Sequence, residues 1–253
     1  MRKIILVTDR IYHVYNRGVE KRDIFPSPDD YSRFISILDH HLKYAYPYSV
    51  LKHRLGKAQS PEARREILLQ LELKRIEPPV AIISFCLMPN HYHLTLKQLV
   101  ENGVTDFMHR MGTSYTGYFN LRRERTGRLF DSPFKTALVK SEEQLLYLTR
   151  YQHINPRVLG LKTSGEFVDY PWSSLSTYLG GERFPFVKPE VVMSTFAKPE
   201  GYLDFVSAKI DEFEPPRLQK IAIDDDFGWF AEFRALEKDR REQLRDRYLS
   251  TLG

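Results

Sequence analysis

Two histidines stand two residues apart in the segment Pro-Asn-His-Tyr-His-Leu-Thr-Leu, residues 89–96. His91 and His93 alternate there with apolar residues, and a period of two is typical of a half-buried strand. Both imidazoles would then project from one face, where two neutral imidazoles can hold one divalent metal. The alternative is a pair of histidines on a wet strand face that bind nothing.

A tyrosine and an asparagine follow at helical spacing in the segment Tyr-Leu-Thr-Arg-Tyr-Gln-His-Ile-Asn-Pro, residues 147–156. Ser141 begins a capping-box pattern, so the predicted helix begins at Ser141 and ends or kinks at Pro156. Tyr151 and Asn155 share one face of this helix. The amide oxygen of Asn155 could bind a metal while the phenol of Tyr151 points at the same place. The alternative for Tyr151 is an aromatic side chain of an amphipathic core.

Three further residues have the chemistry of the candidate site. Tyr115 could compete with Tyr151 as a nucleophile, but its neighbours four residues away are methionine and phenylalanine, which favours packing. His153 points about 200° away from Tyr151 around the predicted helix, so we do not expect it to be a ligand. His13 lies on the first predicted strand, where it could neighbour the metal site or be a satisfied core histidine.

The order of predicted elements indicates the fold class. Strands are expected at 10–17, 80–88 and 91–97, with two short strand-like pieces within 128–139. Helices are expected from Asp29 and Asp30, from the cap at Thr105 and Asp106, and from Ser141. This order predicts an α+β fold with a ferredoxin-like antiparallel sheet and helices on one face, plus a helical insertion and a C-terminal extension.

The domain organisation follows from the same reading. Residues 1–180 are expected to form the catalytic domain, with an insertion at about 54–78 that contains a helix from Ser60 to about Arg75. Residues 181–253 are expected to form a mostly helical extension that ends in a charged helix at about 230–249. That last helix could pack on the domain, bind a partner or close over the active site.

Composition favours an anionic partner. The chain has 253 residues, a formal net charge of +5 and a pI of about 9.1. Residues 1–200 carry +8 and residues 201–253 carry −3, so the basic part is the candidate catalytic part. One cysteine, Cys86, excludes an internal disulfide and a cysteine-rich zinc site. We expect a cytoplasmic protein without a membrane span, because the N-terminal apolar run is too short for a signal peptide.

Taken together, these motifs resemble those of the HUH-class single-tyrosine transposases, in particular the REP-associated tyrosine transposases. The resemblance covers about residues 10–180 and rests on Met-Pro-Asn-His-Tyr-His and Tyr-Gln-His-Ile-Asn-Pro. Further similar segments lie at 12–18, 118–120, 127–130 and 169–174.

The resemblance implies a specific chemistry. Tyr151 would attack a phosphate of single-stranded DNA, form a 5′-phosphotyrosine link and free a 3′-hydroxyl. Mg²⁺ or Mn²⁺ would be the cofactor, with His91, His93 and Asn155 as its ligands. Some relatives carry a glutamine at the position of Asn155, so this third ligand is a hypothesis. No Walker loop or dinucleotide fingerprint is present.

Cationic residues could bind the DNA backbone. The segment 121–128 has four arginines in eight residues, and with Lys135 and Arg110 it could form a groove for phosphates. The alternative is a solvated helix end. The resemblance places the Asn-Arg-Gly stretch near DNA, so Arg17 ranks first. The predicted DNA-binding residues are Arg17, Arg122, Arg123, Arg125, Arg128 and Lys135.

Three classes of function remain open at this point. The first is an active transposase that cleaves and rejoins single-stranded DNA at hairpin-flanked sites. The second is a domesticated relative that binds such hairpins without cutting, and the third is a different metal enzyme, such as a hydrolase. The expected partner is single-stranded DNA with hairpin structure, and the protein is expected to be a monomer or a homodimer.

Overall fold

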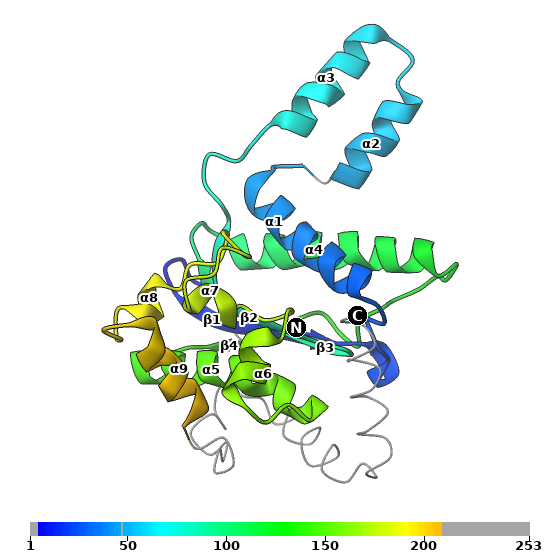
Figure 1. The fold of residues 1–253 in the computed structure, drawn as a ribbon. Coiled ribbons are helices and arrows are strands. Elements are labelled where there is room, and N and C mark those ends of the chain that lie inside the picture. The colour runs from blue at the N-terminus through cyan, green and yellow to red at the C-terminus, as the bar shows by residue number, and fades with distance from the viewer. Residues whose placement is uncertain (1–4, 47, 209–253) are drawn as a thin grey trace.

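A four-stranded antiparallel sheet forms the centre of the part of the chain that the structure describes (Figure 1). The structure is a computed structural model, and it describes residues 5–46 and 48–208. The strands lie in the order β2-β3-β1-β4, which is the ferredoxin-like order and confirms the predicted α+β class. Their bounds are β1 (Ile11–Arg17), β2 (Val80–Met88), β3 (His91–Gln98) and β4 (Lys135–Leu138).

The histidine strand β3 lies inside the sheet. It pairs with β2 through a tight turn in which Met88 faces His91, and with β1 in a register that places Arg17 opposite His91. Almost every residue of β3 is buried, on both faces of the strand. The prediction of a half-buried strand was therefore wrong, because the face that carries the histidines is covered rather than wet.

Two long helices, α1 (Pro28–Lys43) and α4 (Gly103–Arg122), pack against each other on one face of the sheet. Both helices were predicted, and each has a buried apolar face. Tyr115 is fully buried in this layer and its hydroxyl donates to the carbonyl of Ile24, which confirms the packing interpretation. Helix α4 begins two residues earlier than predicted, with Asn102 as its N-cap in the left-handed conformation.

A third long helix, α5 (Glu142–Ile154), covers the opposite face of the sheet, which corrects the prediction that helices lie on one face only (Figure 1). Ser141 caps it as predicted by accepting from the backbone N–H of Gln144. The Gln144 side chain accepts from the N–H of Lys140, so the capping box is displaced by one residue. A short 3₁₀ turn, η2 (Asn155–Leu159), follows α5, in agreement with the predicted kink at Pro156.

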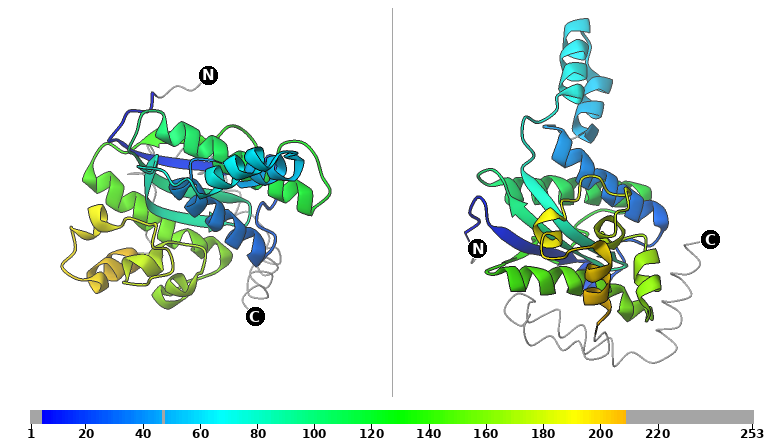
Figure 2. Two further views of the ribbon diagram at one scale, coloured as in Figure 1. Left: turned by 90° about the horizontal axis from the view of Figure 1, so that it is seen from above. Right: turned by 60° about the vertical axis from the view of Figure 1, so that its left-hand side comes forward.

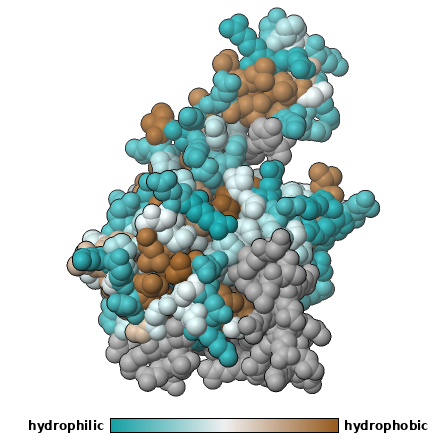
Figure 3. Space-filling view, viewed as in Figure 1, coloured by the Kyte–Doolittle hydropathy of each residue, from teal (hydrophilic) through white to brown (hydrophobic). Residues whose placement is uncertain are grey.

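The insertion is a helical hairpin of α2 (Tyr48–Lys57) and α3 (Pro61–Glu72) that projects from the body of the molecule (Figures 1 and 2). It begins earlier than the predicted residue 54, because α2 was not foreseen. Ser60 caps α3 as predicted, by accepting from the N–H of Ala63, but α3 ends at Glu72 rather than near Arg75. Apolar atoms gather on the hairpin surface (Figure 3), where Leu68 and Leu69 are exposed on α3.

The region that was expected to hold two strand-like pieces contains one strand, β4, and a single bridge between Gly18 and Phe130. Beyond α5, the described chain continues in short helices: α6 (Ser164–Asp169), α7 (Leu175–Tyr178), α8 (Glu190–Met193) and α9 (Pro199–Ser207). Helices α8 and α9 pack against α5, and α6 packs against α7 and α9.

Residues 181–208 belong to the same hydrophobic core as the sheet. Val187 forms a parallel bridge with Ile82 of β2, and Tyr202 and Val206 are fully buried. The predicted helix at 230–249 lies outside the described residues. None of the helices in the described ranges is long and apolar enough to cross a membrane.

Candidate functional site

His91 and His93 face the layer between the sheet and α5. Their rings meet edge to face with centroids 5.0 Å apart. This separation is shorter than the rise of about 7 Å over two strand residues, so the side chains lean toward each other. His93 is fully buried and His91 is 7% exposed. The two imidazoles therefore converge in a nearly dry environment.

Tyr151 reaches this pair from α5. Its ring meets the ring of His93 edge-on, with centroids 5.5 Å apart. The next residue, Gln152, anchors the helix to the sheet, because its Oε1 accepts from Ser84 Oγ of β2 and from Thr95 Oγ1 of β3. The tyrosine is thus held against the histidine strand by a helix that is hydrogen-bonded to two strands.

The opposite side of α5 is fixed by His153. Its Nδ1 lies 2.7 Å from the hydroxyl of Tyr202, and its Nε2 lies 2.9 Å from Oγ of Ser174. Burial lowers the pKa of His153 to about 3, so the ring is neutral at physiological pH. As predicted, His153 points away from the candidate site, and it serves to dock the helix.

Asn155 follows Tyr151 by one helical turn and is 4% exposed. Its Oδ1 is buried and accepts no hydrogen bond from any described residue. Buried amide oxygens usually have a partner, because leaving one without a hydrogen bond costs about 1–3 kcal/mol. An oxygen of this type suits a hard divalent cation. Its role as the third ligand stays a prediction.

A metal centre here would depend on a mixed ligand set. Within residues 5–46 and 48–208, no three His, Cys, Asp or Glu side chains are grouped as metal ligands. Two imidazoles and one amide oxygen would leave coordination positions open for substrate and water. The pKa of His93 lies well below its usual value, mainly because the ring is buried and also because His13 lies beside it. The neutral imidazole is the form that binds metals.

His91 and His93 each have a hydrogen-bonding neighbour at Nδ1. Nδ1 of His91 lies 2.7 Å from Oδ1 of Asn90, and Nδ1 of His93 lies 2.9 Å from Nε2 of His13. The rings of His13 and His93 are stacked, and Tyr15 stacks on His13. Of the two interpretations of His13, the structure therefore favours the neighbour of the site. Tyr15 was not predicted to be near the site, although alternation along β1 is a signal that would have placed it on one face with His13. No such signal marks Asn90 or Gln152.

Two of the predicted DNA-binding residues lie beside His91. Arg17 and Lys135 line a pocket together with His91, and the remaining lining residues are Tyr15, Asn16, Tyr92, Asp131 and Ser132. The Arg17 guanidinium lies 3.9 Å from Asp131, and both side chains are partly exposed. An ion pair of this length between partly exposed side chains contributes little to stability, so Asp131 holds Arg17 only weakly.

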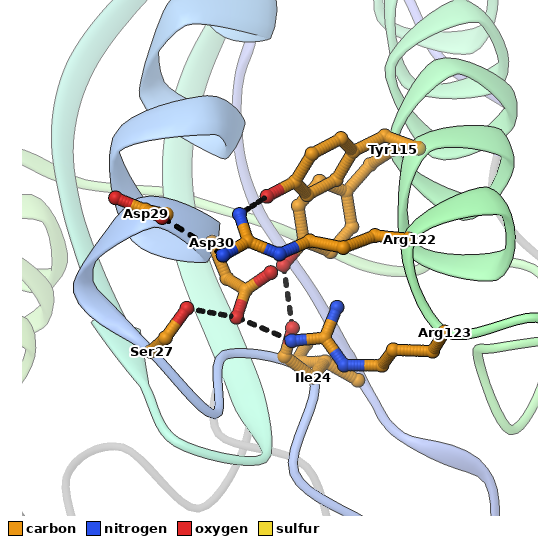
Figure 4. A network of polar contacts seen from close by, with 8 residues as sticks. Ile24, Ser27, Asp29, Asp30, Tyr115, Arg122 and Arg123 are labelled. Carbon is orange, nitrogen blue, oxygen red and sulfur yellow. Dashed lines mark hydrogen bonds and ion pairs between the residues drawn. The ribbon is translucent and has the colours of Figure 1, made fainter.

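Arg122 and Arg123 are placed elsewhere and perform a structural task (Figure 4). Arg123 donates to the fully buried carboxylate of Asp30 at 2.6 Å, and Ser27 Oγ donates to the same carboxylate oxygen. Arg122 donates to Asp29 and to the hydroxyl of Tyr118. These contacts tie the C-terminal end of α4 to the N-terminal end of α1.

The remaining arginines do not complete a groove at His91. Arg125 donates to Oδ1 of Asn120 and to the carbonyl of Arg128, which orders the turn after α4. Arg128 is exposed and lines a different hollow, one that also includes Phe130 and Phe134. Arg110 donates to the carbonyl of Ala45 on the α1 side of the molecule. The structure thus separates the six predicted DNA-binding residues into a pair at the site and a group at the end of α4.

The chain is similar to a known protein in fold and not in sequence. No protein family model matches the chain, and no curated protein matches it. The fold is similar to a solved structure of a REP-associated tyrosine transposase bound to a REP hairpin. That similarity has a TM-score of 0.46 and 12% sequence identity, and it covers 74% of this chain and 90% of the other.

Proposed function

We propose that this protein is a metal-dependent DNA strand transferase that cleaves and rejoins single-stranded DNA at hairpin-flanked sites, with Tyr151 as the nucleophile. The observation that carries the proposal is the contact of the Tyr151 ring with His93, which itself lies against His91. A tyrosine, two converging imidazoles and the buried Oδ1 of Asn155 are the parts that this chemistry needs.

The tyrosine requires help to react. A phenol has a pKa near 10, so at neutral pH it is a poor nucleophile. Mg²⁺ or Mn²⁺, held by His91, His93 and Asn155, would supply charge neutralisation at the scissile phosphate. The contribution of α5 is to hold Tyr151 in one orientation, because positioning a nucleophile for in-line attack removes much of the entropic barrier.

The reaction conserves the energy of the broken bond. The phenolic oxygen of Tyr151 forms a bond to phosphorus, and the phosphorus bond to the 3′ oxygen breaks and leaves a 3′-hydroxyl. A second 3′-hydroxyl reverses the step, releases the tyrosine and joins two strands. Because the phosphotyrosine link replaces one phosphodiester bond by another, no nucleotide hydrolysis is needed.

Arg17 and Lys135 are the residues we assign to the DNA strand. Both line the pocket that contains His91, so they can contact the phosphates on either side of the scissile one. Tyr15 lines the same pocket, where Nζ of Lys135 lies 5.9 Å from the centre of its ring. Arg122 and Arg123 are better explained by their ion pairs with α1.

A covalent-adduct assay tests the proposal. Labelled single-stranded DNA from the regions flanking the gene is incubated with the protein and Mn²⁺ or Mg²⁺, and the products are separated on a denaturing gel. We expect a metal-dependent shifted band that is lost in Tyr151→Phe. Tyr147→Phe is the matched control, because Tyr147 lies one turn earlier on α5 and packs on Phe205.

The other outcomes distinguish the remaining functions. Tight hairpin binding without an adduct would overturn the strand-transferase proposal in favour of a binding protein that does not cut. Cleavage that persists in Tyr151→Phe would exclude the tyrosine as nucleophile and favour a metal-activated water.

A further inference from the structure

We propose that His13 and Asn90 are positioning residues that fix the tautomers of the two histidines, so that both rings present Nε2 to the metal. The inference rests on the proposed function, because it concerns the same two candidate ligands. It adds what the ligand set alone does not explain: which nitrogen of each ring binds, and what holds the rings in that state.

The tautomer of His91 follows from the orientation of Asn90. The Asn90 amide nitrogen donates to the carbonyl of Lys21, so its Oδ1 is the atom that faces His91. An amide oxygen only accepts hydrogen bonds. Nδ1 of His91, 2.7 Å away, must therefore carry the proton, and the lone pair of the neutral ring lies on Nε2.

His93 has two arrangements available. Either its Nδ1–H donates to Nε2 of His13, or Nε2–H of His13 donates to Nδ1 of His93 across the same 2.9 Å contact. The first arrangement leaves the lone pair of His93 on Nε2, and the second places a proton there and prevents binding through that atom. A metal bound at Nε2 of His93 is compatible only with the first arrangement, which is therefore the one that the proposal requires.

The surroundings of His13 restrict it to this role. His13 and His93 are both fully buried, so bulk water does not compete for the contact between them. Strand pairing fixes the separation, since His13 lies opposite Thr95 and Tyr15 lies opposite His93. The ring centres of Tyr15 and His93 each lie 5.1 Å from that of His13, and these two neighbours further limit rotation of its ring. Neighbours of this kind orient metal-binding histidines and raise metal affinity.

A purely structural role for His13 makes different predictions. A packing histidine could be replaced by an apolar side chain with an effect on stability alone. A positioning residue must also change the proton location on His93 and the affinity for metal. Both quantities can be measured without any DNA cleavage.

The experiment combines nuclear magnetic resonance with metal titration. Long-range nitrogen–proton correlation spectra of the metal-free protein report which nitrogen of each histidine carries the proton. We expect the Nδ1–H tautomer for both His91 and His93. In His13→Leu, the His93 signal should shift toward the Nε2–H tautomer, and the Mn²⁺ affinity should fall by about 10- to 100-fold.

Two variants serve as controls. His13→Gln places an amide oxygen near the position of Nε2, so it should retain the tautomer and most of the Mn²⁺ affinity. His41→Leu makes the same change at another buried histidine, which contacts Ser114 between α1 and α4 and should leave both readouts unchanged.

The outcomes separate this inference from the proposed function. An Nε2–H tautomer of His93 in the wild-type protein would overturn it, as would unchanged tautomer and Mn²⁺ affinity in a folded His13→Leu. If His13→Leu fails to fold, the wild-type spectrum and the His13→Gln variant still decide whether His13 fixes the tautomer of His93. Absence of Mn²⁺ binding to the wild-type protein would instead overturn the proposed metal site, while the tautomers would still test the role of His13.

Discussion

The rings of Tyr151 and His93 are in edge-to-face contact, with centroids 5.5 Å apart, although the two residues come from different layers of the fold. The contact depends on Gln152, which joins α5 to β2 and β3 through hydroxyl groups of those strands. A tyrosine that is placed by a helix bonded to its own sheet has a defined position relative to the candidate metal ligands.

Asn155→Ala should lower Mn²⁺ affinity and adduct formation together, with little effect on the metal-free fold. The reason is that Oδ1 of Asn155 has no hydrogen-bond partner among the described residues, so its removal leaves none of their donors without an acceptor. We expect the free energy of unfolding of the metal-free protein to change by no more than about 1 kcal/mol. Titration with Mn²⁺ and urea denaturation measure the two effects. Unchanged Mn²⁺ affinity would show that Asn155 is not a ligand.

Much of the fold could be predicted from short-range patterns. The alternation of β1 and β3, the apolar stripes of α1 and α4 and the Ser141 cap are local features, so the elements and their order follow from the sequence. The layer opposite α1 and α4 could not be predicted in this way. Whether α5 covers the second face of the sheet depends on long-range contacts such as that of Gln152 with Ser84.

The candidate site was predicted in part for a similar reason. Spacing of two and of four residues indicated His91, His93, Tyr151 and Asn155. The contact between His13 and His93 joins residues 80 positions apart, so it depends on strand register, which periodicity does not give. The density of arginines in 121–128 indicated a DNA groove, but Asp29 and Asp30, on another helix, bind two of them.

Arg17→Ala should therefore affect DNA binding, whereas Arg123→Ala should affect stability. Arg17→Ala should weaken binding of single-stranded DNA and reduce the slope of log affinity against log salt by about 0.7, the value for one phosphate contact, with little change in stability. Arg123→Ala leaves the buried Asp30 carboxylate without its cation, so we expect a loss of about 3 kcal/mol in stability. Its effect on the salt dependence of binding should be small.

Two measurements check this contrast: fluorescence titrations with single-stranded DNA at several salt concentrations, and urea denaturation of each variant. Lys97→Ala is a suitable control, because Lys97 lies on the histidine strand and forms an exposed ion pair with Asp9. A reduced salt slope in Arg123→Ala at constant stability would place the α4 end in the DNA interface after all.

Stability should fall as the pH drops below about 6.5, in part because of His153. Burial lowers the pKa of His153 to about 3 in the folded protein, whereas an unfolded histidine has a pKa of about 6.5. Between these values the unfolded state binds a proton that the native state does not bind, so protonation favours unfolding. From pH 7 to pH 5 this one group should lower the free energy of unfolding by about 2 kcal/mol. Urea denaturation of the wild type and of His153→Gln checks it, since the variant should lose that part of the pH dependence.

The active site should be formed by one chain. Helix α5 is docked on its own sheet from two sides, through Gln152 with Ser84 and Thr95 and through His153 with Ser174. Exchange of this helix between two subunits would require every one of these buried contacts to form again on the partner's sheet, and a polar group left unpaired there would cost about 1–3 kcal/mol. We therefore expect that mixing Tyr151→Phe protein with His91→Ala protein restores no adduct formation.

The mixing experiment includes its own control. Wild-type protein diluted with either variant should lose activity only in proportion to its share, because each chain acts with its own tyrosine and its own histidines. Restoration of cleavage in the mixture of the two variants would require a site built from His91 of one chain and Tyr151 of another. In that case the contacts of Gln152 and His153 would have to form between subunits, and a dimer would be the active form.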